Sequence, residues 1–438
     1  MKKWTKRISV ALVMVLVFGA VQNKEDFFGE KQALAQEVQA PEQFTSSDGK
    51  YTYQYNEDGE TITLTKYYSA PEEVEVTLPK EVDGLPVTGF AKNTFGAYSN
   101  FASPYFEKVI VPGNYKKINS FGVCHNLKEI TFQKGVKQIE DYAFDRCKNL
   151  EKVTLSESVI KIGTAFSGCD ALKSINLPSK LKGKVNLDST NIKKLKVPKG
   201  VTKISLENCL KLQEVILPKE MKDLGDDTFS SNWKLKKIVL PENIEDIGEN
   251  TFSACVSLKK IELPAKVTRI YQNGFTACRS LKEIDLSSVK RIDHSAFFSC
   301  ESLKKVTFGN LKVLGDSSFS CCNSLTEVVI PGTVRMYDEP EEFEGAEYNI
   351  GSSADVGAYS FAECKSLKNV VIKEGVRSIG KEAFAECDAL RSITIPKTVK
   401  KVGKKAIPKN AGKTVIRGEA GSWIEKYAKK NGYKFRQI

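Results

Sequence analysis

The sequence is poor in the residues that usually mark a metal centre or a catalytic site. It contains only two histidines, His125 and His294, and no pair of cysteines at the two-to-four-residue spacing that structural zinc sites use. Neither histidine lies in a nucleophile motif such as Gly-x-Ser-x-Gly. We therefore expect no catalytic residues, no metal and no cofactor. Two carboxylates acting in hydrolysis would leave no such motif, so that alternative stays open.

The apolar run Ile8–Ala20 is too short to cross a bilayer, which takes about 18 residues. It follows a basic start and precedes a small-x-small site that ends at Ala35, an arrangement typical of a secretory signal peptide. We predict a signal peptide over residues 1–35 and a linker over 36–43, with an uncleaved anchor as the alternative. Residues 1–35 contain no cysteine, which argues against a lipid-modified N-terminus.

A repeat of mostly 22 or 23 residues organises the rest of the chain. Most units share the pattern A-F-x-x-C-x-x-L-x-x-I-x-L-P-x-x-V-x-x-I-G, as residues 143–163, 251–271 and 383–403 illustrate. Apolar positions two apart share one face of a short strand. Because one unit cannot bury its apolar residues alone, stacked units should form one continuous core. The predicted fold is a repeat solenoid, a curved rod of short parallel strands.

Both ends of the rod should carry caps, because the unpaired edges of stacked strands invite aggregation. Tyr51–Tyr68 alternates like two strands around an Asp-Gly turn. Near the other end, Ser422 and Glu425 have the spacing of a helix capping box, and Asn431-Gly432 should end that helix. The predicted domains are an N-terminal β cap with the opening repeat (44–95), the solenoid (96–407) and a C-terminal helix/strand cap (408–438).

The string LPVTG, from Leu85 to Gly89, matches the recognition sequence of enzymes that attach proteins to Gram-positive cell walls. A sorting signal of that kind needs a hydrophobic stretch and a basic tail after the string, whereas Gly89 precedes the repeats. Val87 and Phe90 also fit the V-x-x-I positions of the opening repeat. We therefore predict a structural role for this string.

The chain resembles the BspA-type leucine-rich repeat surface proteins over roughly residues 44–438. The resemblance rests on the AFxxCxxLxxIxLP units, the segment VTLPKEVDGLPVTGFAKNTF and the final segment GSWIEKYAKKNGYKF. It implies a curved leucine-rich repeat solenoid, export, and a role in adhesion or in binding host or bacterial surfaces.

Ten of the eleven cysteines occupy one position of the repeat, so we expect a column along the solenoid rather than a disulfide framework. Ser189 and Asn232 are expected to take this position in two units. Parallel side chains on neighbouring coils have poor dihedral angles for a disulfide. We therefore expect buried free thiols, and the adjacent pair Cys321 and Cys322 is the exception to test.

The residue between the last two apolar positions of each unit should point outwards on the concave sheet. Apolar side chains there can mark an interaction patch, and two pairs fall in successive units. Glu262 and Asp285 are also neighbours, and their repulsion would favour a nearby cation or basic partner. Ordinary β-forming and solvated residues would give the same pattern. The candidate ligand-binding residues are Ile216, Val239, Glu262, Asp285, Val329 and Val371.

Charge suggests a second kind of contact. Removal of residues 1–35 takes away six basic and three acidic residues, so the net charge falls from +12 to +9. A lysine column, from Lys128 to Lys368, could meet a wall polyanion, although solvated lysines covering the rim would look the same. Nucleic acid is not expected, because no aromatic residues alternate with the lysines. An acidic insertion, 336–356, could be a solvated loop, a partner contact or a weak calcium site.

These patterns favour an exported, non-enzymatic protein that binds a protein or glycan ligand at the cell surface or in the medium. No membrane span is expected once the signal peptide is removed. The first alternative is a structural envelope component held by charge to wall polyanions. The second is a secreted hydrolase that uses carboxylates on the sheet.

Overall fold

The computed structural model describes residues 41–438 apart from 92–93, 96–104, 120 and 337–353. The predicted signal peptide and residues 36–40 of the linker therefore lie outside the described residues, as does most of the acidic insertion. All the repeats lie in one compact unit, Thr45–Ile438.

The N-terminal cap begins with the expected pair of strands. Tyr51–Tyr55 and Ile62–Tyr67 pair antiparallel, and Gly59 lies at the turn between them with φ of 66°. The wall-anchor-like string lies in the strand Leu85–Phe90, where Val87 and Phe90 are buried, so its structural role is confirmed. This sheet has the order β1 (Phe44–Thr45), β2 (Tyr51–Tyr55), β3 (Ile62–Tyr67), β6 (Leu85–Phe90) and β5 (Glu81–Val82).

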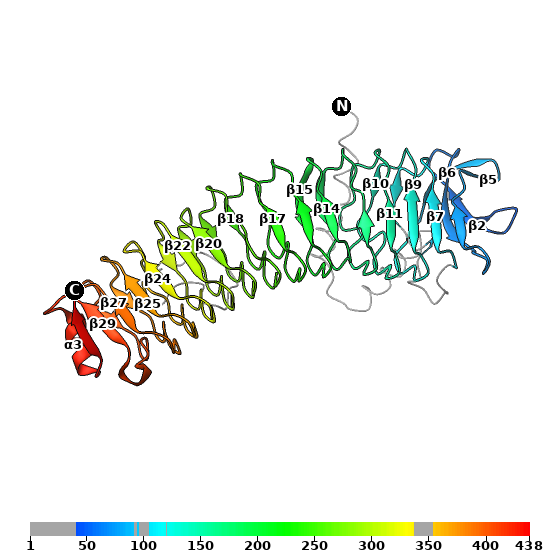
Figure 1. The fold of residues 1–438 in the computed structure, drawn as a ribbon. Helices are drawn as coiled ribbons and strands as arrows, with labels where there is room; N and C mark the ends of the chain where they lie inside the picture. Colours follow the sequence, from blue (N-terminus) through cyan, green and yellow to red (C-terminus); the bar gives the residue numbers. More distant parts are fainter. Residues whose placement is uncertain (1–40, 92–93, 96–104, 120, 337–353) are drawn as a thin grey trace, which may run out of the picture. The chain divides into compact units, whose positions relative to one another are not determined.

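The L-x-x-I-x-L segments form short parallel strands that follow one another in sequence order (Figure 1), as predicted. We call this set the outer ladder, and it is made of four sheets. They are β4 (Glu75–Thr77), β7 (Lys108–Val111), β9 (Glu129–Phe132), β11 (Lys152–Thr154) and β12 (Ser174–Ile175); β14 (Lys194–Lys196), β16 (Glu214–Ile216) and β17 (Lys237–Val239); β20 (Glu283–Leu286) and β22 (Lys305–Phe308); and β24 (Glu327–Ile330), β25 (Asn369–Ile372), β27 (Ser392–Thr394), β29 (Val415–Gly418) and β30 (Lys434–Gln437).

The V-x-x-I-G segments form a second ladder of shorter parallel strands. Their apolar residues, such as Ile247 and Ile270, are fully buried and oppose each other across neighbouring coils. The strands of this ladder are β8 (Lys117–Ile118) and β10 (Gln138–Ile139); β13 (Gly183–Asn186) and β15 (Val201–Ser205); β18 (Asp246–Ile247), β19 (Arg269–Ile270), β21 (Arg291–Ile292) and β23 (Val313–Leu314); and β26 (Ser378–Ile379) and β28 (Lys401–Val402).

The third side of each coil is a turn that brackets the A-F pair. In one coil the turn contains Asn250 and Ala254, whose φ values are 49° and 55°. Such left-handed backbone is unfavourable for residues other than glycine. Hydrogen bonds to the next coil compensate for it, because the N–H of Asn250 donates to Gln272 at 3.1 Å and that of Ala254 to Thr276 at 2.7 Å.

Phenylalanine rings stack from coil to coil inside this turn. The rings of Phe95, Phe121, Phe144 and Phe166 lie 4.8 to 5.2 Å apart. A second stack runs through Phe229, Phe252, Phe275, Phe297, Phe319, Phe361 and Phe384, with spacings of 4.9 to 5.5 Å. In the two short coils between the stacks, the buried side chains of Leu187 and Leu206 take the place of the rings.

The cysteine column is present, and each buried thiol has a partner. The Sγ of Cys255, for example, donates to the carbonyl oxygen of Phe229 in the preceding coil at 3.1 Å. All eleven cysteines are free thiols, as expected, and Cys321 is the only one of them that is not fully buried. Cys321 lies outside the column because it occupies a left-handed turn position, with φ of 62°.

One assignment to this column was wrong by a residue. Ser189 has positive φ and is only half-buried, so it occupies the turn position that precedes the column. The column position belongs to Thr190, which is buried and has its Oγ1 3.4 Å from the Sγ of Cys209. Asn232 was assigned correctly, because its Nδ2 donates to the carbonyl oxygen of Leu206 at 3.0 Å.

The C-terminal cap contains the predicted helix, α3 (Trp423–Lys430), which follows the 3-10 turn η1 (Asn410–Gly412). The Ser422 side chain accepts a hydrogen bond from the N–H of Glu425, as a capping box requires. On this helix, Ile424 and Ala428 are buried, whereas Trp423 and Tyr427 are half-buried. Within the described ranges, no helix has the length and apolar character that a membrane crossing needs.

Candidate ligand-binding groove

An open groove of about 500 Å³ lies over the outward face of β16 and β17. Ile216 and Val239 lie opposite each other in this pair of strands, and they are 53% and 69% exposed. Alternation along each strand explains this, because Val215 and Ile238 point into the core while the next residue points out. Each strand is followed by Leu-Pro, and proline cannot donate to a ladder.

The groove continues across the following coils. A second hollow of about 540 Å³ extends from β17 to residues 259–264, and a third of about 380 Å³ reaches β20 and β22. Glu262 contributes to both of these hollows, and Asp285 contributes to the third. The structure therefore brings four of the six candidate residues together: Ile216, Val239, Glu262 and Asp285.

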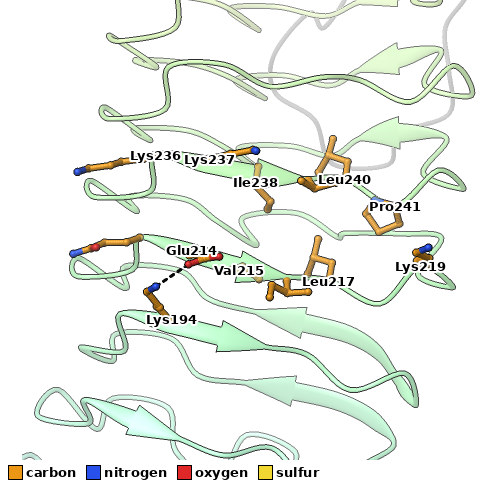
Figure 2. Close-up of a pocket in the computed structure, with 13 residues that line it drawn as sticks. Lys194, Glu214, Val215, Leu217, Lys219, Lys236, Lys237, Ile238, Leu240 and Pro241 are labelled. Carbon is orange, nitrogen blue, oxygen red and sulfur yellow. Dashed lines mark ion pairs between the residues drawn. The ribbon is translucent and has the colours of Figure 1, made fainter.

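The basic side chains of the first hollow differ in how they are paired. Lys194 lies 3.1 Å from Glu214, as the dashed line in Figure 2 shows. Lys236 and Lys237 also line the hollow, and among the described residues no acidic group lies within 4 Å of either ammonium group. The apolar pair is therefore bordered by two lysines without an ion pair in the described chain, and the charge of Lys237 acts only at longer range, where it helps to lower the pKa of Glu262.

Both candidate acids of the third hollow, Glu262 and Asp285, have local partners. Lys260 lies 2.8 Å from Glu262, and this contact lowers the pKa of the Glu262 carboxyl. Asp285 accepts hydrogen bonds from the hydroxyl and the N–H of Ser287, which lower its pKa, and the charge of Lys305 adds to the effect. The repulsion expected from the sequence is thus relieved by neighbouring residues.

Val329 and Val371 form a second apolar pair on a different sheet. They lie opposite each other in β24 and β25, and Val329 is 49% exposed whereas Val371 is half-buried. The first pair is more exposed and is bordered by the groove described above. A binding role for all six candidate residues stays a prediction.

Sequence reasoning missed a buried ion cluster on the second ladder. The Asp293 carboxylate is fully buried and accepts from the Nε of Arg269 at 3.0 Å and from the Nε of Arg291 at 2.6 Å. The motif R-I-D beside a buried strand was its only signal. Because both arginines compensate the buried charge, we interpret the cluster as structural. No group of three or more His, Cys, Asp or Glu residues within the described ranges could hold a metal.

Similarity to known proteins agrees with this architecture. The family model "BspA type Leucine rich repeat region (6 copies)" matches residues 93–207, 222–340 and 352–438. None of the curated proteins matches the chain.

Several solved structures are similar. A leucine-rich repeat protein from Bacteroides ovatus is 24% identical with a TM-score of 0.58, over 89% of this chain and 98% of its own. A leucine rich cell surface protein from Faecalibacterium prausnitzii is 23% identical with a TM-score of 0.48, over 86% and 98%. The pneumococcal vaccine antigen PcpA is 18% identical with a TM-score of 0.49, over 92% and 100%.

The Bacteroides ovatus structure supports the fold alone, and no argument rests on the other two. The family model covers well over half of the chain, and its repeats coincide with the stacked coils. The chain therefore belongs to the BspA-type leucine-rich repeat family.

Proposed function

We propose that this chain is an exported recognition protein that binds a protein ligand at a cell surface or in the surrounding medium. The binding site is the groove over β16 and β17. The observation that carries this proposal is the exposed apolar pair Ile216 and Val239 on a rigid parallel ladder. Family membership and the expected signal peptide over residues 1–35 support export.

The lining of the groove favours a protein over a glycan. The residues around it are aliphatic or charged apart from Gln213 and Thr307, and none of them is aromatic. Sugar rings are commonly held by stacking on aromatic faces, which the lining of the groove does not offer. Aliphatic side chains of a protein ligand would instead cover Ile216 and Val239, and complete burial of such a side chain stabilises a complex by about 1.5–3 kcal/mol. We propose no catalytic role for this site.

The test is a double substitution in the apolar pair. Ile216→Ser with Val239→Ser should weaken binding of the labelled protein to bacterial or host cells at least about tenfold, since each side chain loses apolar contact. The free energy of unfolding should change by no more than about 0.5 kcal/mol, because both residues are exposed. Thr131→Ser with Thr154→Ser is the matched control on the same ladder, and it should bind like the unaltered protein.

The second apolar pair provides a discriminating variant. Val329→Ser with Val371→Ser should leave binding unchanged if the groove over β16 and β17 is the site. Loss of binding in this variant alone, with full binding after substitution of Ile216 and Val239, would move the site to β24 and β25 and overturn the proposal.

The unpaired lysines favour a second candidate function, a structural envelope protein held by charge to wall polyanions. Contacts between exposed charges are screened by salt. Complete release from isolated cell walls at about 0.5 M salt, with no effect of the Ile216 and Val239 substitutions, would favour this alternative.

A further inference from the structure

A second exposed apolar feature lies on the same coils as the groove. The residue directly after the cysteine position is polar or charged in the coils on either side, with His125, Lys148, Asp170 and Asn191 before, and Arg279, Glu301, Asn323, Lys365 and Asp388 after. In three successive coils it is apolar instead. We call Leu210, Trp233 and Val256 the apolar stripe.

Backbone hydrogen bonds hold the three residues of the stripe in register. The N–H of Asn208 donates to Ser230 at 2.9 Å, and that of Ser231 donates to Ser253 at 2.7 Å. These bonds join neighbouring coils two or three residues before each member of the stripe. Leu210 is 38% exposed, Trp233 is 52% exposed and Val256 is half-buried, so the stripe presents an apolar surface to solvent.

The charged residues near the stripe are paired differently from those in the coils that follow it. In the two coils after Val256, the same repeat position holds Arg279 and Glu301, whose charged groups lie 3.3 Å apart and neutralise each other. Next to the stripe itself lie Lys211 and Lys234, and among the described residues neither has an acidic group within 4 Å.

The same lysine-rich surface joins the stripe to the groove. Between Trp233 and Val239 the exposed residues are Lys234, Lys236 and Lys237, while Leu235 and Ile238 point into the core. Val239 lies six positions after Trp233, so the path is at most about 20 Å long. One apolar anchor therefore lies at each end, with three unpaired ammonium groups between them.

We propose that this surface binds an extended segment of a protein partner in which carboxylates lie between two apolar side chains. The proposal rests on the proposed function and names the chemistry of its ligand. One apolar side chain packs on Ile216 and Val239, and the other packs on Trp233. The carboxylates between them pair with Lys234, Lys236 and Lys237. Tryptophan is a frequent binding hot spot, because it buries a large area with little loss of conformational freedom.

The test uses three fluorescein-labelled peptides measured by fluorescence anisotropy against the full chain. Each has a leucine at both ends, with four glutamates, four serines or four lysines between them. The glutamate peptide should bind at least about tenfold tighter than the serine peptide, and the lysine peptide should not bind, because charge complementarity decides among them. Equal binding of all three peptides would overturn the proposal.

Two variants assign the contacts. Trp233→Ser should weaken the glutamate peptide about tenfold, whereas Tyr142→Ser, which removes an aromatic ring exposed on another coil, should not. Lys236→Glu with Lys237→Glu should reverse the preference towards the lysine peptide. Lys282→Glu with Lys304→Glu, at the lysine-column position of other coils, is its control and should keep the preference.

The outcomes separate this proposal from its alternatives. If inorganic polyphosphate displaces the glutamate peptide and Trp233→Ser has no effect, charge alone governs binding and the proposal is wrong. If binding needs Trp233 and the lysines but not Ile216 and Val239, the proposed groove fails while the acidic ligand stands. If binding needs Ile216 and Val239 but shows no preference for glutamate, the groove stands and this inference fails.

Discussion

The coils at residues 107–176 and those at 210–262 have the same kind of interior, but the side chains on their outer faces differ in polarity and in charge pairing. In the first region Thr131, Thr154 and Asn176 point outwards, and successive coils are joined by ion pairs such as Lys128 with Glu107 at 2.7 Å and Lys173 with Glu151 at 2.7 Å. In the second region apolar side chains point outwards beside unpaired lysines. The interior thus specifies the stacking, and the outer face can differ from coil to coil without altering it.

The largest expected effect tests the shared interior. Phe144→Ala in the first region and Phe252→Ala in the second should each lower the free energy of unfolding by about 3–5 kcal/mol, because each leaves a cavity in a ring stack. Urea unfolding followed by circular dichroism measures the loss. A difference between the two variants of more than about 2 kcal/mol would show that the interiors are not equivalent.

A smaller effect should appear at alkaline pH. Burial raises the pKa of Cys255 to about 12 and holds the pKa of Cys278 and Cys169 well above the ordinary value of 9.0. Unfolded thiols ionise near pH 9, whereas these folded thiols stay protonated. The stability they contribute is therefore complete below about pH 8 and is lost as the pH rises, by about 1.4 kcal/mol per pH unit for each thiol.

The urea midpoint between pH 7 and pH 10.5 measures this loss. Buried thiols with raised pKa values occur in both regions, so both regions should lose stability as the pH rises. Cys255→Ala removes one such thiol and should make the decline shallower. A midpoint that stays constant up to pH 10.5 would contradict the expected protonation of the column.

The smallest expected effect concerns the outer face of the first region. Glu151→Gln removes the ion pair with Lys173, and both side chains are about half exposed. Pairs of this kind contribute about 0.2–1 kcal/mol, so the loss should not exceed that range. Lys237→Met in the second region breaks no ion pair and should change stability still less. A larger loss for Lys237→Met would show a structural partner for that lysine and weaken the comparison.

The sequence predicted the interior well because one period governs it. Leu, Ile, Val, Phe and Cys recur at fixed positions, and a strand turns alternate side chains to opposite sides, so the buried columns and the outward residues follow directly. The prediction failed at Ser189 because that coil is short. A coil without Phe and Cys offers no marker, and the assignment shifted by one residue to the neighbour of Thr190.

The outer face could be predicted only in part. Alternation along the strands identified Ile216 and Val239 as exposed neighbours, and the register confirms their pairing. Whether a lysine finds a partner depends on distances across coils, so the pairing of Lys194 with Glu214 and the absence of a described partner for Lys237 needed the structure. The apolar stripe with Trp233 was not predicted, because its residues lie in turns, where no alternation tells an exposed side chain from a buried one.

The insertion after Met336 has a practical consequence. The N–H of Met336 donates to the buried Asp355 carboxylate at 2.8 Å, and the rings of Phe319 and Phe361 on either side stack at 5.4 Å. The two ends of the inserted segment are therefore held close together by this hydrogen bond, and the coils before and after it stack as other neighbouring coils do. Because lengthening a closed loop costs little free energy, a small reporter domain with adjacent termini could be grafted between these two residues while the stacking is preserved.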